Sequence, residues 1–113
     1  MFSITTNRVR DAVKVTEGTE SMILRVDFDP MAFVRVLETA KAKLGAVRFA
    51  QDDSAPQVVQ AARDFAAAIF GGEQAGRLLD FYGGHGAPVI SICSRYLRGR
   101  LAKKVIRAQR AKR

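Results

Sequence analysis

Polar and apolar side chains alternate along residues 11–28, which is the pattern of β-strands with one buried face. The apolar positions of two successive runs are Val13, Val15, Met22, Leu24, Val26 and Phe28. Between the runs, the segment EGTE at residues 17–20 supplies a turn. We therefore predict a β-hairpin over residues 11–28, and residues 2–6 are a candidate for a further short strand.

From residue 29 onward the apolar positions follow the spacing of a helix. Asp29 is suited to cap free amide groups, and Pro30 fits the first helical position, where its missing donor costs nothing. The apolar stripe consists of Phe33, Leu37, Ala40, Leu44 and Val47. The polar segment 50–56 interrupts this stripe, so the first helix is expected to end before it.

Two more helices are predicted between this polar segment and residue 84. Asp53 or Ser54 can cap the first of them, which ends at the glycine pair 71–72. The second covers residues 73–81 and stops at the glycine pair 83–84. The apolar stripe of the longer helix consists of Val58, Ala62, Phe65 and Ile69.

The last predicted helix starts near Ala87 or Pro88. Its apolar positions repeat every four residues, at Val89, Cys93, Leu97, Leu101 and Val105. Arginines and lysines fill most of the remaining positions, so the helix is amphipathic as far as Val105. Beyond Arg107 we expect the chain to leave the body, with residues 108–113 as a frayed basic tail.

Together these elements predict an α+β fold, mostly helical, in which an N-terminal β-hairpin packs on about four α-helices. A chain of 113 residues is long enough to bury its own core, and we expect a single domain over residues 1–113. The hairpin region covers residues 1–28 and the helical region residues 29–113. Because a two-stranded hairpin is marginal in water, it has to pack against the helices.

Positive charge is concentrated at the C-terminal end. The chain has 19 basic residues and 11 acidic residues, and all the acidic ones lie between Asp11 and Asp80. Nine basic residues follow Ser94, whereas the part before Arg95 is nearly neutral. This segment is interpreted as a solvated helix face or a protein-binding arm, with nucleic acid as the alternative partner. We favour the first interpretation, because the segment has one tyrosine for base stacking and follows no recognisable nucleic-acid module.

Candidate catalytic and metal-binding residues are few. Cys93 is the only cysteine and lies on an apolar stripe, so we interpret it as a small buried hydrophobe. His85 is the only histidine and lies in a glycine-rich loop with no partner at ligand spacing, which indicates a surface residue. The glycines of IFGGEQAG lack the lysine of a phosphate loop. We therefore expect no enzymatic activity, no metal and no cofactor.

No stretch of the sequence resembles a membrane-spanning segment or a signal peptide. The N-terminal residues have no apolar core, and no run approaches the roughly 18 apolar residues that a bilayer requires. We expect a cytoplasmic protein without a membrane partner.

The C-terminal half carries apolar anchors and turns in a characteristic order. A helix ends in Ile-Phe-Gly, an acidic residue follows, a Leu-Asp-Phe-Tyr-x-Gly segment comes next, and a basic helix closes the chain. The residues are Ile69, Phe70, Gly71, Glu73, Leu79, Asp80, Phe81, Tyr82, Gly84, Leu101, Lys104, Val105 and Ala108. In this order and spacing, residues 66–113 resemble the C-terminal half of small tail assembly chaperones from siphophages and prophages of Gram-positive bacteria.

The resemblance implies a non-enzymatic protein of the host cytoplasm, absent from the mature virion. Such a chaperone binds the tape-measure protein and helps tail-tube subunits to assemble around it. The expected contact residues are Phe81, Tyr82, Arg95, Arg98, Arg100, Lys103, Lys104 and Arg107. A small basic nucleic-acid-binding protein is the alternative, and a homo-oligomer stays open.

Overall fold

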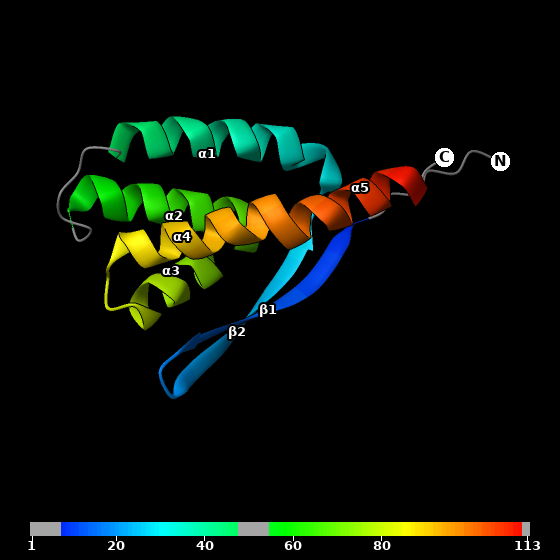
Figure 1. Ribbon diagram of the computed structural model, residues 1–113. Helices are drawn as coiled ribbons and strands as arrows, with labels where there is room; N and C mark the ends of the chain where they lie inside the picture. Colours follow the sequence, from blue (N-terminus) through cyan, green and yellow to red (C-terminus); the bar gives the residue numbers. More distant parts are fainter. Residues whose placement is uncertain (1–7, 48–54, 112–113) are drawn as a thin grey trace.

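The structure, a computed structural model, describes residues 8–47 and 55–111 of the chain, without the side chains of residues 44–47 and 110–111. A two-stranded antiparallel hairpin packs on a helical body, so the predicted α+β, mostly helical fold is confirmed (Figure 1). The elements are β1 (Val9–Glu17), β2 (Glu20–Phe28), the 3-10 helix η1 (Pro30–Ala32), α1 (Phe33–Val47), α2 (Pro56–Phe70), α3 (Gly72–Phe81), α4 (Gly86–Tyr96), the π-helical turn η2 (Leu97–Leu101) and α5 (Ala102–Ala111). The candidate strand at residues 2–6 lies outside the described residues.

The hairpin follows the predicted alternation. β1 and β2 pair from Val9 opposite Phe28 to Glu17 opposite Glu20, which leaves a two-residue turn between the strands. The buried positions are Val9, Val15, Leu24, Val26 and Phe28, with Val13 and Met22 partly buried on the same face. β1 begins at Val9, ahead of the predicted start at Asp11, and Asp11 lies on the inward face because it alternates with Val9, Val13 and Val15.

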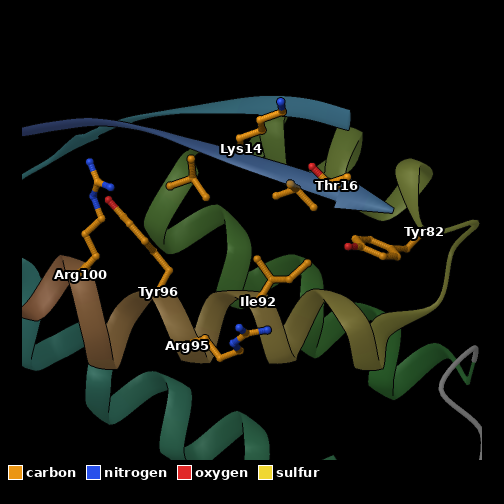
Figure 2. Close-up of a pocket in the computed structure, with 9 residues that line it drawn as sticks. Lys14, Thr16, Tyr82, Ile92, Arg95, Tyr96 and Arg100 are labelled. Carbon is orange, nitrogen blue, oxygen red and sulfur yellow. The ribbon is translucent and has the colours of Figure 1, made fainter. Parts of the chain in front are cut away.

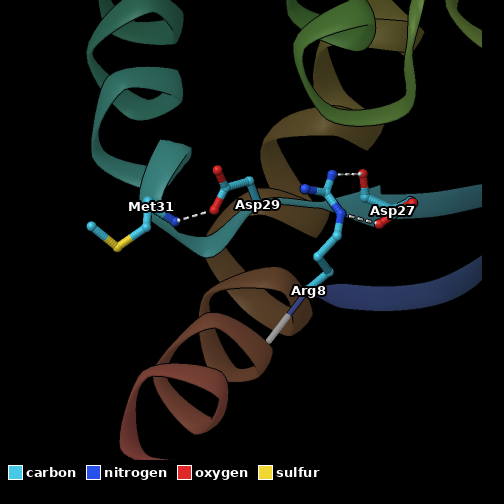
Figure 3. A network of polar contacts seen from close by, with 4 residues as sticks. All are labelled: Arg8, Asp27, Asp29 and Met31. Carbon is cyan, nitrogen blue, oxygen red and sulfur yellow. Dashed lines mark hydrogen bonds and ion pairs between the residues drawn. The ribbon is translucent and has the colours of Figure 1, made fainter. Parts of the chain in front are cut away.

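The first helix begins as the sequence predicts. The carboxylate of Asp29 accepts a hydrogen bond from the Met31 amide at 3.0 Å, and Pro30 holds the first helical position (Figure 3). Beside it, the Arg8 guanidinium pairs with Asp27 at the end of β2. Of the predicted stripe, Ala40 is buried and Phe33 and Leu37 are partly buried, while the side chains of Leu44 and Val47 lie outside the description.

The start of α2 differs from the prediction. Its N-cap residue is Ala55, which makes no side-chain hydrogen bond, and Pro56 takes the first helical position. The candidate caps Asp53 and Ser54 lie outside the described residues, and neither occupies the cap position. A proline there removes one of the amide groups that a cap would have to satisfy.

Glycines end α2 and α3, as predicted. After α3 the amides of Gly83 and Gly84 donate to the carbonyls of Asp80 and Leu79 at 3.0 and 2.9 Å, which is the Schellman arrangement. Both glycines have positive φ angles, of 64° and 83°, a conformation that side chains disfavour. The chain then reverses relative to α3, so that α4 begins at Gly86 beside Val58 and runs along α2 in the same direction as α2.

The predicted last helix is continuous in space but contains a π-helical turn (Figure 1). A four-residue repeat overshoots each full turn of an α-helix by about 40°, so five such positions would spread over about 160°. The π turn uses wider hydrogen-bonded loops and rotates less per residue, which returns Leu101 and Val105 to the buried side. All five repeat positions are at most 2% exposed. The four-residue repeat is thus the sequence signal of this turn.

The end of the last helix differs from our expectation. α5 continues to Ala111, beyond Arg107, where we expected the chain to leave the body. Ala108 packs partly against the core, so an apolar contact continues beyond Val105, the last position of the predicted stripe. Within residues 8–47 and 55–111, no helix has both the length and the apolar character needed to cross a membrane.

Candidate binding groove

An open groove of about 430 Å³ lies between β1 and the last helix (Figure 2). Its lining residues are Val13, Lys14, Val15, Thr16, Tyr82, Ile92, Arg95, Tyr96 and Arg100. Three of them, Tyr82, Arg95 and Arg100, belong to the contact residues predicted from the sequence. The fold therefore brings the aromatic end of α3 next to part of the basic helix face.

Asp11 anchors one end of this groove to the last helix. Its carboxylate accepts hydrogen bonds from the Tyr96 hydroxyl at 2.9 Å and from Arg100 Nη2 at 2.8 Å. The Asp11 side chain is only 5% exposed, whereas that of Arg100 is 62% exposed. Arg100 therefore already has an internal acidic partner, which a binding partner would have to share.

The contacts of Asp11 determine its ionisation. Burial by itself raises the pKa of the Asp11 carboxyl, but hydrogen bonds from the Ala12 amide, Tyr96 and Arg100 outweigh it, so the pKa lies below its ordinary value. For Tyr96, burial and the neighbouring carboxylate both raise the pKa of the phenol. The ring of Tyr96 also stacks on Phe70, with centroids 5.7 Å apart. The pair thus consists of a carboxylate and a neutral phenol held in place by core packing.

The two predicted aromatic contact residues have different positions. Tyr82 lines the groove, and its pKa is raised by burial and by the nearby Glu17. Phe81 does not line the groove and packs edge-on against the ring of Tyr82, with centroids 5.2 Å apart. Both side chains are half-buried against the core, so Tyr82 combines packing with access to the groove while Phe81 mainly supports it.

The remaining predicted basic contact residues do not line this groove. Lys104 and Arg107 meet Arg10 of β1 and the preceding Arg8 around another hollow of about 210 Å³, which we call the basic hollow. Arg98 and Lys103 are exposed and line neither site. The predicted basic contact residues are therefore divided among the groove, the basic hollow and exposed positions outside both.

Cys93 and His85 are placed as predicted. Cys93 is fully buried, and burial raises the pKa of its thiol to about 12, so that it is a neutral core residue. His85 is exposed and immediately precedes α4. In the described part of the chain, no three histidine, cysteine or acidic side chains are grouped to hold a metal ion.

Sequence reasoning missed Tyr96 as a groove residue and Asp11 as its partner, although a signal for each was present. Asp11 continues the alternating series with Val13 and Val15, so it belongs to the buried face and needs a polar partner there. Tyr96 widens the apolar stripe of the last helix, and a buried tyrosine needs a partner for its hydroxyl. Each residue supplies the partner that the other needs, because the Tyr96 hydroxyl donates a hydrogen bond to the Asp11 carboxylate.

Comparison of this chain with protein-family models, curated protein sequences and solved structures finds no significant match.

Proposed function

We propose that this protein is a non-enzymatic phage tail assembly chaperone. It binds the tape-measure protein in the host cytoplasm during tail morphogenesis, with the tail-tube protein as a possible second partner, and it is absent from the mature virion. The observation that supports this proposal is the groove between β1 and α4, because it gathers Tyr82, Arg95 and Arg100 from separate parts of the segment that carries the resemblance.

The chemistry of the groove suits protein binding. Val13 and Ile92 are partly buried apolar side chains in its lining, while Arg95 supplies exposed positive charge. A tape-measure protein is long, helical and prone to aggregate, so a partner that covers apolar surface and adds complementary charge protects it. The residues of the resemblance, among them the buried Ile69, Phe70 and Leu79, form the scaffold behind this surface.

The test is direct binding to the tape-measure protein of the same phage or prophage, measured by calorimetry with the full-length chaperone. We expect a specific complex that Arg95→Glu weakens about tenfold or more, because it reverses a charge in the groove. Arg98→Glu changes the net charge equally but lies outside the groove, so it is expected to retain most of the affinity. Absence of a complex, or equal effects of the two variants, would contradict the proposal.

A small nucleic-acid-binding protein is the second candidate, and the basic hollow is the observation that favours it. Arg8, Arg10, Lys104 and Arg107 can together neutralise several phosphates. Gel-shift titration with duplex and single-stranded DNA at two salt concentrations separates the candidates. Submicromolar binding at physiological salt that is lost in Lys104→Glu/Arg107→Glu supports nucleic acid and counts against the chaperone.

A further inference from the structure

The two outer edges of the hairpin differ in their hydrogen bonding. On β2, the side-chain amide of Gln74 from α3 accepts a hydrogen bond from the Arg25 amide and donates one to the Arg25 carbonyl, both at 2.6 Å. These contacts show that the backbone groups of Arg25 point away from β1. In an antiparallel ladder, residue pairs that are hydrogen-bonded to each other alternate with pairs whose backbone N–H and C=O groups point away from the partner strand. We call the second kind outward pairs. Arg25 and its partner Ala12 are therefore an outward pair.

The same alternation identifies the outward groups of β1. Two and four residues beyond Ala12, the pairs Lys14–Ile23 and Thr16–Ser21 are also outward pairs. Lys14 and Thr16 both line the groove. In Figure 2 the Lys14 side chain points away from α4, so at this residue it is the backbone of β1 that forms the rim of the groove. Among the described residues, no other element hydrogen-bonds the backbone of Lys14 or Thr16.

An unpaired strand edge that faces a helix across a groove can accept another strand. A strand added to β1 presents alternate side chains to the two faces of the sheet. One set points toward Val13, Val15 and Ile92, and the other set lies beside the exposed side chain of Lys14. The first environment is apolar and the second is cationic.

Charge favours an acidic occupant. The lining of the groove includes three basic residues and no acidic residue. Arg100 is paired with Asp11, whereas no ion pair to Lys14 or Arg95 is found in the described part of the chain. Acidic side chains on the outer face of an added strand would pair with Lys14 without displacing an internal contact, and Arg95 across the groove adds positive charge that favours an acidic segment.

We propose that the groove binds an extended, acidic segment of a partner protein as a third β-strand on the outer edge of β1. The inference goes beyond the proposed function, because it specifies the conformation and charge of the bound segment whichever protein carries it.

The test uses the full-length protein and a nine-residue capped peptide that alternates valine and glutamate. At saturating peptide, we expect hydrogen exchange of the Lys14 and Thr16 amides, followed by NMR, to slow at least about tenfold because they become hydrogen-bonded. The Val13 and Val15 amides, which already face β2, should change little. The same peptide methylated on its backbone nitrogens keeps its side chains but cannot pair, and it should not bind.

Proline variants separate the two edges. Thr16→Pro removes an amide on the groove edge, and an edge strand tolerates proline at such a position. We expect it to weaken peptide binding about fivefold or more, as the loss of a hydrogen bond implies. Ser21→Pro removes the corresponding amide of the same residue pair on the opposite edge, so it should keep the wild-type affinity.

Charge variants test the acidic preference. Lys14→Glu/Arg95→Glu should weaken peptide binding at least about tenfold, whereas the matched variant Arg98→Glu/Lys103→Glu should bind nearly as well as the wild type. Equal binding of the methylated peptide, unchanged exchange at Lys14 and Thr16, or no binding at millimolar peptide would overturn the proposal. A dimer in light scattering, with the two amides already protected in the free protein, would instead assign the edge to a second copy and likewise overturn it.

Discussion

Asp11 is the residue on which the junction between hairpin and last helix depends. A carboxylate on the inward face of a strand is unfavourable unless donors compensate for its lost hydration. Here the Ala12 amide, the Tyr96 hydroxyl and the Arg100 guanidinium supply them. An asparagine at this position would offer the Tyr96 hydroxyl and the Arg100 guanidinium one neutral acceptor oxygen in place of two charged ones.

We therefore expect Asp11→Asn to lower the free energy of unfolding at neutral pH by roughly 1–3 kcal/mol. Because the pKa of Asp11 is lowered in the folded protein, the contribution of its charge is complete above the unfolded pKa of about 3.9 and is lost as the pH falls through the folded value. Urea unfolding should thus show a constant difference between wild type and variant from about pH 5 upward that shrinks below about pH 4.

The matched control for this titration is Asp27→Asn. Asp27 pairs with Arg8, and both side chains are largely exposed, so its replacement should have a much smaller effect on stability. A difference for Asp11→Asn that persists undiminished to pH 2 would show that packing of the side chain, not its charge, ties β1 to the helix.

The approach of α4 to α2 depends on a missing side chain. A Cβ atom at Gly86 would lie 2.9 Å from both Cγ1 and the carbonyl oxygen of Val58, and the backbone atom cannot move without shifting α2. We expect Gly86→Ala to destabilise the protein by about 1–3 kcal/mol, a fall in Tm of several degrees. Gly76→Ala, within α3, is the control, since its new Cβ would meet only the Nη1 atom of Arg63 from α2, at 3.7 Å. That variant should be neutral or gain up to about 1 kcal/mol from helix propensity, and a similar loss in both variants would contradict this account.

The helices and strands were largely predictable because local patterns determine them. Alternation predicted the hairpin, and glycine pairs predicted the ends of α2 and α3. The groove was predictable only in part: Tyr82, Arg95 and Arg100 were named, but the contacts of Asp11 and Gln74 that hold the hairpin against the helices were not. Asp11 contacts Tyr96 across 85 positions of the sequence and Gln74 contacts Arg25 across 49, and no local pattern carries such pairings. The same holds for Gly86, whose role is visible only once α2 lies beside it.

The last helix contacts both the helical body and the first strand of the hairpin. α4 packs against α2, and α5 approaches β1 near the basic hollow (Figure 1). Leu101 lies at the end of the π turn between these contacts and is fully buried. The packing of Leu101 therefore determines where the last helix lies against the hairpin, and so the position of the groove.

We expect Leu101→Asp to lower the free energy of unfolding by several kcal/mol, because it places an unpaired charge in the core. Lys103→Asp, at an exposed position of the same helix, should change stability by less than about 1 kcal/mol. If the hairpin and the helices unfold as one cooperative unit, native-state hydrogen exchange of Leu101→Asp should show the same loss of amide protection, relative to wild type, in β2 and in α2. Loss confined to the hairpin would mean that the last helix stabilises β1 alone, and that the groove opens without unfolding the helical body.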